Sequence, residues 1–354
     1  MHRTARIVPI LTLVAGGALL NAGVAHGASG ASGVQETRAP KPISREAADT
    51  RTEQRTVASY WTEARMEAAT PIDVLAKRTN GVQFSASVGA PAKGRVSGGS
   101  PLTVTPTAPG SAARLAPAQA QQAAAPNSSG TAWTRGGAVT MTTGRIFFTY
   151  QGRNASCSGS AVTSANKSVV LTAGHCVKLG GAFHSNWVFV PGYNEGERPH
   201  GTWVATRLIT TPGWNSREDV NGDMAAAVVA PLDGKLLTDV VGGQGVAFNQ
   251  GRRQQMYSFG YPASGRYDGS RLIYCSGRAF DDFLLSQGIG LTCNMTGGSS
   301  GGPWLLNFNE STGLGTLNSV NSFKYNFSPN WMFGPYFGTE AKAVYEAAQR
   351  GDAT

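Results

Sequence analysis

A serine set among glycines stands out in the stretch Thr296–Pro303, which reads Thr-Gly-Gly-Ser-Ser-Gly-Gly-Pro. Glycine accepts positive φ and lets another backbone approach closely. A tight turn of this composition can hold a serine hydroxyl beside backbone N–H groups, as a nucleophile with an oxyanion hole requires. Gly/Ser runs are more often plain loops, so the stretch needs a partner elsewhere in the chain. The string Leu171–Cys176 (Leu-Thr-Ala-Gly-His-Cys) supplies one, with His175 as the base.

The order of these groups along the chain decides between triad arrangements. A nucleophilic serine requires a histidine that takes its proton and a carboxylate that orients the histidine. The pattern Gly298-x-Ser300-x-Gly302 also fits a nucleophile elbow, but that arrangement places the histidine after the serine, and no histidine follows His200. A carboxylate shortly before the histidine is excluded, because residues 131–174 contain no Asp or Glu. The order His, Asp, Ser remains.

This order, with the strings Thr-Ala-Gly-His-Cys and Gly-Ser-Ser-Gly-Gly-Pro, carries a family resemblance. Residues 131–354 resemble the chymotrypsin-like (trypsin-fold) serine peptidases, and among them the secreted bacterial branch that includes the glutamyl endopeptidases. The resemblance implies an all-β fold of two antiparallel six-stranded β-barrels with a C-terminal α-helix. It also implies hydrolysis of peptide bonds in protein or peptide substrates.

The carboxylate of the triad must come from seven aspartates between His175 and Ser300. Asp223 directly precedes the apolar run Met224–Val229, and a carboxylate at the mouth of a buried strand can hold an imidazole in one tautomer. The family has Asp, a hydrophobic residue and Ala at this place, which Asp223-Met224-Ala225 matches. We expect Asp219, the runner-up, to be a solvated loop carboxylate.

The resemblance places the nucleophile immediately before Gly-Gly-Pro, which favours Ser300 over Ser299. His175 would then act as general base and later as general acid. The N–H groups of Gly298 and Ser300 would form the oxyanion hole, an effect worth about two to three orders of magnitude in rate.

Four cysteines lie at positions 157, 176, 275 and 293. Four cysteines allow three pairings, and we favour Cys157–Cys176, which would fix the loop that carries His175, together with Cys275–Cys293. A metal site built on His175 and thiolates is the alternative, but the short-spaced cysteine pairs typical of zinc sites are missing. We therefore predict neither a metal nor a cofactor. His184 and His200 lie in loop-like sequence and are expected at the surface.

The specificity pocket departs from the relatives that the resemblance suggests. Ser299 stands where trypsin-like zymogens have an Asp that pairs with a newly freed N-terminus, so that switch cannot operate. The histidine with which glutamyl endopeptidases read an acidic side chain is also missing. Asn294 is expected at the base of the pocket, with Ser322, Phe323 and Lys324 near its wall. A neutral pocket is favoured, Lys324 points only weakly to acidic side chains, and the specificity stays open.

Net charge separates the chain into two parts. Residues 1–130 hold 13 Lys and Arg against 7 Asp and Glu, a net +6, whereas residues 131–354 hold 17 against 14, a net +3. The basic excess thus lies mostly in a segment that we expect to be removed, and no Lys/Arg run that could follow phosphates is present. Nucleic acid is not predicted as a partner.

The N-terminal region predicts export and processing. A basic start, an apolar stretch from Ile7 to Val24 and small residues near Gly27 indicate a signal peptide over residues 1–27. Residues 28–130 form the predicted pro-region, without a segment that would remain inserted in a membrane. It contains a helical stretch over 44–69, with Val57, Trp61, Ala64 and Ala68 at helical spacing, and an Ala/Pro/Gly/Ser/Gln-rich linker over 85–129 that we expect to be disordered.

Short β-branched and aromatic runs, punctuated by Gly, Asn and Pro, follow from residue 131 and predict a sandwich or barrel. The predicted strands cover residues 145–150, 168–171, 186–190, 202–205, 225–230, 255–260, 271–274, 289–294 and 314–323. A terminal helix is predicted over 339–350, with Ala341, Val344, Tyr345 and Ala348 on one face.

The sequence therefore predicts a secreted, monomeric serine endopeptidase in residues 131–354, acting through His175, Asp223 and Ser300 and an acyl-enzyme. A non-catalytic trypsin-fold binding protein and an esterase with the same triad are the alternatives.

Overall fold

The computed structural model describes residues 41–80, 99–109 and 127–352. All of them belong to one compact unit, Arg38–Thr354. The predicted signal peptide lies outside the described residues.

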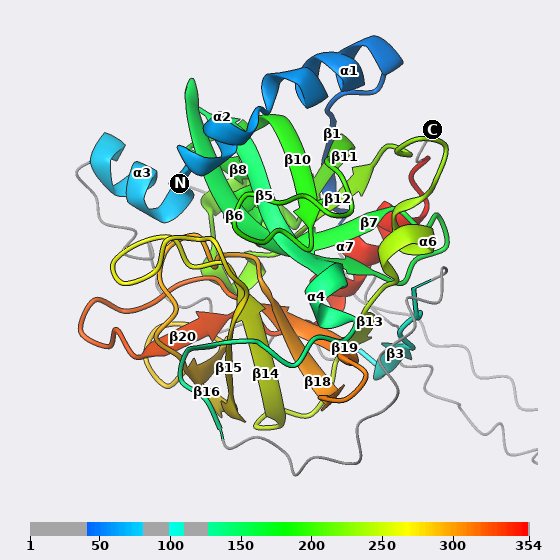
Figure 1. Ribbon diagram of the computed structural model, residues 1–354. Helices are drawn as coiled ribbons and strands as arrows, with labels where there is room; N and C mark the ends of the chain where they lie inside the picture. The colour runs from blue at the N-terminus through cyan, green and yellow to red at the C-terminus, as the bar shows by residue number, and fades with distance from the viewer. Residues whose placement is uncertain (1–40, 81–98, 110–126, 353–354) are drawn as a thin grey trace, which may run out of the picture. The chain divides into compact units, whose positions relative to one another are not determined.

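Six strands close into an antiparallel barrel in the first half of the predicted catalytic region (Figure 1). The order around the barrel is β11-β10-β5-β6-β7-β12, and β12 pairs back onto β11. These strands are β5 (Thr143–Tyr150), β6 (Arg153–Val162), β7 (Val169–Thr172), β10 (Ser185–Pro191), β11 (Trp203–Thr210) and β12 (Ala225–Val229). Buried Val, Ile, Phe and Trp side chains of these strands fill the barrel.

The second half consists of two sheets. A seven-stranded sheet has the order β3-β13-β19-β18-β14-β15-β4, antiparallel except for the β13–β19 pair, and a three-stranded sheet has the order β16-β17-β20. The first comprises β3 (Leu102–Val104), β4 (Thr131–Ala132), β13 (Gly245–Phe248), β14 (Gln255–Gly260), β15 (Ile273–Arg278), β18 (Pro303–Asn309) and β19 (Leu314–Val320); the second comprises β16 (Phe280–Asp281), β17 (Ile289–Thr292) and β20 (Trp331–Gly334). The disulfide between Cys275, in β15, and Cys293, just after β17, joins them. The fold is mostly β and trypsin-like, as the sequence predicts.

The helices are short and lie between or after the strands. They are α4 (Val139–Thr142), α5 (Pro212–Arg217), α6 (Leu237–Val241) and the C-terminal α7 (Thr339–Gln349), with 3-10 turns η1 (Gly174–Cys176) and η2 (Val220–Gly222) and the hairpin β8 (Lys178–Leu179) and β9 (Ala182–Phe183). Helix α7 buries the predicted face of Ala341, Val344, Tyr345 and Ala348. Within the described ranges, no helix is long and apolar enough to cross a membrane.

The predicted helix over 44–69 is wrong in its bounds. The structure has β1 (Ile43–Glu46), α1 (Arg51–Tyr60), α2 (Glu63–Glu67), β2 (Thr70–Pro71) and α3 (Ile72–Asn80) instead. Thr50 and Glu53 form a capping box that starts α1, and Thr62 accepts from the Arg65 N–H to start α2, so one helix becomes two. Val57 and Trp61 are buried as the spacing predicts, but Ala64 and Ala68 are exposed.

The predicted linker is also partly structured. Its residues 102–104 form β3, which pairs antiparallel with β13. Backbone hydrogen bonds to a sheet edge stabilise this segment although its composition offers little apolar surface.

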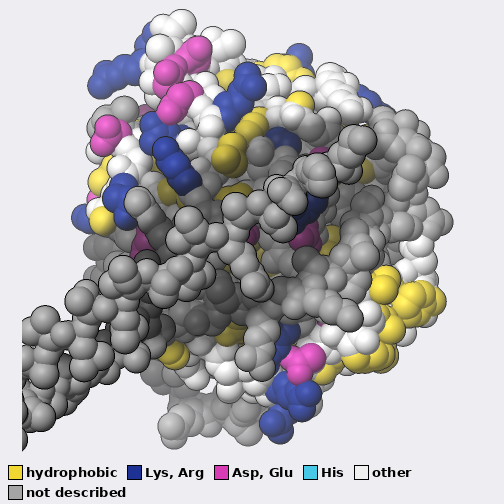
Figure 2. All heavy atoms as spheres, turned by 180° about the vertical axis from the view of Figure 1, so that it is seen from behind, with side chains coloured by type: hydrophobic (Ala, Val, Ile, Leu, Met, Phe, Trp, Pro, Cys, Tyr) yellow, Lys and Arg dark blue, Asp and Glu magenta, His cyan; other side chains and the backbone are white. Residues whose placement is uncertain are grey.

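A few large hydrophobic side chains are exposed among the described residues: Ile43, Phe283, Leu284, Leu285 and Phe327. Figure 2 shows hydrophobic side chains gathered along one margin of the rear face.

Candidate active site

His175 lies where β7 ends. The strand stops at Thr172, and the chain turns into η1, which carries Gly174, His175 and Cys176. The disulfide Cys157–Cys176 ties this turn to the middle of β6. Both disulfides are the pairings that the sequence favours. The imidazole of His175 is buried, so its position is set by the barrel.

Asp223 reaches His175 because β12 pairs with β7. Ala225 lies opposite Thr172, so the ends of the two strands bring the residues just outside them together. The Oδ2 of Asp223 lies 2.8 Å from His175 Nδ1, and its Oδ1 accepts from the His175 backbone N–H at 2.9 Å. The Ser322 hydroxyl also donates to Oδ2. Three donors thus converge on one fully buried carboxylate.

Asp219 stays apart from this cluster. Its carboxylate accepts from the Asn221 N–H at the start of η2 and lies 3.7 Å from Arg217, with a quarter of its side chain exposed. The runner-up aspartate is a turn-capping residue.

Ser300 sits at the tip of a turn that only glycine permits. Gly298 has φ of +97°, and a Cβ there would lie 2.8 Å from the carbonyl oxygen of Tyr261. Gly301 has φ of +80°, and a Cβ there would lie 2.0 Å from Thr172 Oγ1. The neighbouring Ser299 turns away, since its hydroxyl donates to the carbonyl oxygen of Thr296 at 2.7 Å.

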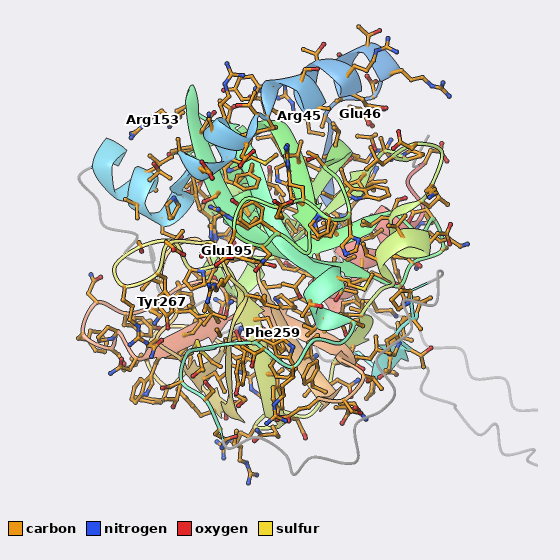
Figure 3. All side chains as sticks on the ribbon, in the orientation of Figure 1. Arg45, Glu46, Arg153, Glu195, Phe259 and Tyr267 are labelled. Carbon is orange, nitrogen blue, oxygen red and sulfur yellow. A yellow bond between two sulfur atoms is a disulfide. The ribbon has the colours of Figure 1, made fainter. Side chains whose placement is uncertain are left out.

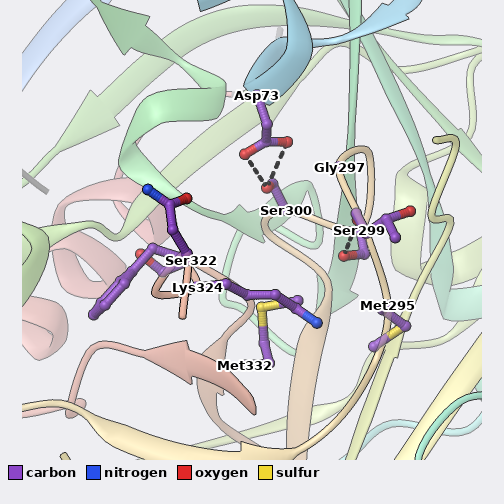
Figure 4. A pocket seen from close by; sticks show the side chains of 11 residues that line it. Asp73, Met295, Gly297, Ser299, Ser300, Ser322, Lys324 and Met332 are labelled. Atoms are coloured by element: carbon purple, nitrogen blue, oxygen red, sulfur yellow. Dashed lines mark hydrogen bonds between the residues drawn. The ribbon is translucent and has the colours of Figure 1, made fainter. Parts of the chain in front are cut away.

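A carboxylate from far away in the sequence meets Ser300 (Figure 4). The Ser300 hydroxyl donates to both carboxylate oxygens of Asp73 at 3.1 Å, and the Gly298 N–H donates to Oδ2 at 3.3 Å. Asp73 Oδ1 also lies 3.9 Å from His175 Nε2. Sequence reasoning missed Asp73, because no local pattern in the pro-region distinguishes it from other helical carboxylates.

Neighbouring carboxylates oppose the effect of burial on the pKa of His175. Complete burial by itself lowers the pKa of this imidazole. The negative charges of Asp223 and Asp73 outweigh burial, so the pKa of His175 is raised above its ordinary value.

A cavity of about 120 Å³ opens beside Ser300. Of the four predicted pocket residues, Ser322, Phe323 and Lys324 line it. Asn294 does not: its side-chain oxygen accepts from the Tyr267 hydroxyl at 2.6 Å, outside the lining. Met295 and Met332 line the cavity instead, which sequence reasoning did not anticipate.

Lys324 gives the cavity a cation. Its Nζ donates to the backbone carbonyls of Cys293 and Pro329. Burial, and to a smaller extent the nearby Arg266, lower the pKa of Lys324 to about 8.

His184 is buried, contrary to the prediction of a surface position. Its ring stacks on Phe148 with centroids 4.3 Å apart, and Nε2 lies 2.9 Å from the carbonyl oxygen of His175. Burial lowers the pKa of His184 to about 3, so the ring is neutral and its Nε2–H donates to that carbonyl. His200 is half-buried.

The side chains of His175, Cys157 and Cys176 lie close enough together to share a metal ion. The two sulfurs are bonded to each other in the disulfide, so they are not thiolate ligands.

Two solved structures are similar over nearly their whole length. The protease Anisep from Arthrobacter nicotinovorans is 45% identical, with a TM-score of 0.57, over 60% of this chain and 96% of that chain. The thermostable serine protease AL20 from an extremophilic microorganism is 42% identical, with a TM-score of 0.57, over 60% of this chain and 100% of that chain. A Glu endopeptidase is similar in fold, with 18% identity and a TM-score of 0.50, over 63% and 98% of the two chains. No family model and no curated protein matches the chain.

The closed barrel is trypsin-like, and its paired strands β7 and β12 bring His175 and Asp223 together at their ends. With its relatives, this chain belongs to the bacterial trypsin-like serine proteases. It is a serine-type peptidase, and its substrates are peptides or proteins.

Proposed function

We propose that this chain is a secreted serine endopeptidase made as a precursor, with residues 1–27 as signal peptide, 28–130 as pro-region and 131–354 as a monomeric catalytic domain. The two disulfides favour an oxidising compartment. The observation that carries the mechanism is the buried carboxylate of Asp223 at 2.8 Å from His175 Nδ1.

Asp223 holds the proton on Nδ1 and leaves Nε2 as the base that faces the substrate. Nε2 takes the proton of Ser300 as its oxygen attacks the scissile carbonyl. The N–H groups of Gly298 and Ser300 stabilise the resulting oxyanion. His175 then protonates the leaving amine, and water releases the acyl group from Ser300 by the same steps.

The residue before the scissile bond would occupy the cavity beside Ser300. Two thioethers, the Phe323 ring and the Lys324 ammonium line it. Such a cavity accepts a side chain with an apolar stem, and the cation adds an attraction for a negative end.

Active-site labelling tests the mechanism. The chain is freed of the residues before 127 by limited proteolysis and treated with a fluorophosphonate, and the modified residue is mapped by mass spectrometry. Label on Ser300 that disappears in Ser300→Ala and persists in the matched Ser299→Ala variant supports the proposal. Absence of label from the folded protein that lacks the residues before 127 would contradict it and favour the binding-protein alternative. Turnover of simple esters without detectable turnover of peptides would favour an esterase.

A further inference from the structure

Residues 43–76 pack on the first barrel as an additional layer. Strand β1 pairs antiparallel with β11 from Ile43 opposite Thr210 to Glu46 opposite Arg207, and β2 pairs parallel with β6. Figure 3 labels Arg45 and Glu46 on this strand, and Glu46 forms an ion pair with Arg207 at 2.7 Å. The segment is therefore held by backbone ladders at two places on the barrel.

Buried apolar side chains between β1 and β2, and directly after β2, also hold the same segment on the barrel. Trp61 is 2% exposed, its ring centroid lies 5.6 Å from that of Phe147, and its Nε1–H donates to the carbonyl oxygen of Asn186 at 2.5 Å. Met66 and Ile72 are buried as well. Side chains of this size dominate the free energy of a packed interface.

This path delivers Asp73 to the active site. Pairing of Pro71 with Ser156 places the start of α3 close to the turn that holds Ser300. The carboxylate takes up two of the groups that peptide hydrolysis needs, the Ser300 hydroxyl and the Gly298 N–H. It thus occupies the place where the oxyanion of a substrate would form.

Asp73 is held in a form that Ser300 cannot cleave. It is the second residue of α3, so its backbone is helical, whereas a peptidase of this fold needs an extended segment. The group facing Ser300 is the side-chain carboxylate. A carboxylate carries no leaving group and repels an attacking oxygen by its charge.

We propose that residues 43–76 are a built-in inhibitor of the peptidase, and that the Asp73 carboxylate is the group that blocks Ser300. This inference rests on the proposed function. Cutting the chain after residue 80 is then insufficient for activity, because the segment stays docked until it is displaced or digested.

Two further observations agree with this kind of control. Ser299 stands where an Asp that binds a free N-terminus would be. Its hydroxyl donates to the carbonyl oxygen of Thr296, so the turn that holds Ser300 is already formed in the full chain. The charged and titratable groups around His175 are Asp223, Asp73 and Glu218, with His184 and Lys178 behind it. Asp73 is one of those that favour the imidazolium, which cannot act as a base.

The test measures the rate of fluorophosphonate labelling of Ser300 in the full chain. Asp73→Ala is expected to label about 10- to 100-fold faster than wild type, the factor that corresponds to losing hydrogen bonds to a charged group. Asp73→Asn, which keeps the shape without the charge, is expected to lie between them. Glu67→Gln, an exposed carboxylate on α2 of the same segment, is the matched control and is expected to label at the wild-type rate.

The outcomes separate this proposal from the proposed function. Fast labelling of the wild-type full chain would overturn the inhibitor and leave the peptidase intact. Labelling after removal of the residues before 127, but not in the full-length Asp73→Ala variant, would overturn Asp73 as the blocking group. Absence of labelling from the shortened form as well would overturn the peptidase mechanism.

Discussion

Replacing Trp61 by alanine should make Ser300 more accessible, although Trp61 contacts neither Ser300 nor Asp73. The side chain is buried against Phe147 and donates to the Asn186 carbonyl. Removing a buried tryptophan costs about 3 to 5 kcal/mol. At about 1.4 kcal/mol for each factor of ten, docking of residues 43–76 should weaken by about 10²- to 10³·⁵-fold.

The labelling rate at Ser300 reports this change. While the undocked fraction is small, the rate rises in proportion to it, and it levels off once most molecules are undocked. Trp61→Phe keeps most of the apolar contact and loses only the N–H donor, so about a tenfold rise is expected from one hydrogen bond. Arg51→Ala, at an exposed position of α1, should change nothing.

A second readout makes the prediction refutable. Added trypsin should cut Trp61→Ala within residues 43–76 faster than wild type, because the segment spends more time undocked. Faster cutting together with an unchanged labelling rate would show that docking does not control access to Ser300. Thermal unfolding of the variants, followed by circular dichroism, checks that the barrel itself remains folded.

Three further predictions concern the peptidase freed of its N-terminal region. Asp223→Asn should lower kcat on a peptide by about 10³- to 10⁴-fold with little change in KM, because an amide cannot accept from all three donors and favours the wrong tautomer of His175; a change in KM alone would contradict this role. Replacing Cys157 and Cys176 together by alanine opens a loop of 19 residues and should cost about 3 kcal/mol in denaturant unfolding, whereas an unchanged midpoint would mean that the barrel alone holds the turn. Burial lowers the pKa of Lys324 to about 8, so its charge is present below that pH and lost above it. The ratio of the cleavage rate after Glu to the cleavage rate after Gln should therefore fall as the pH rises from about 6.5 to about 9.5. This fall should be absent in Lys324→Met. A ratio that stays flat in the wild-type enzyme would show that the charge of Lys324 does not act on the substrate side chain.

The strands rich in β-branched and aromatic residues could be predicted from the sequence, because strands buried in a barrel interior require them. Strand β6 was not predicted: its sequence, Arg-Asn-Ala-Ser-Cys-Ser-Gly-Ser-Ala-Val, is small and polar, and it is a strand because β5 and β7 pair with it on both sides. Tertiary pairing decides this segment more than local preference does. Strand β18 (Pro303–Asn309) was also missed, although its sequence, Pro-Trp-Leu-Leu-Asn-Phe-Asn, is largely apolar, because it begins directly after the glycine turn.

Some residues of the candidate site could be predicted from local sequence, and others depend on tertiary pairing. His175 and Ser300 stand in strings whose residue types are dictated by local geometry, and Asp223 is marked by the buried strand that follows it. The contact of Asp73 with Ser300 depends on the register of β1 and β2 against the barrel, over 227 residues of chain. No spacing rule spans that distance. The burial of His184 was missed likewise, since it depends on Phe148, which lies in β5.

The pairing of β1 with β11 also has a consequence for a whole population of molecules. Each polypeptide carries one inhibitory segment, so inhibitor and enzyme are always synthesised in equal amounts. When a segment leaves, the edge of β11 from Arg207 to Thr210 is open to any other copy of the same strand. Segments that leave one molecule intact could therefore silence another active molecule until they are digested. Once enough segments have been digested, free enzyme accumulates and accelerates the digestion of the rest. Activation should thus show a lag followed by a sharp rise, with a delay that lengthens when a free peptide of residues 43–76 is added.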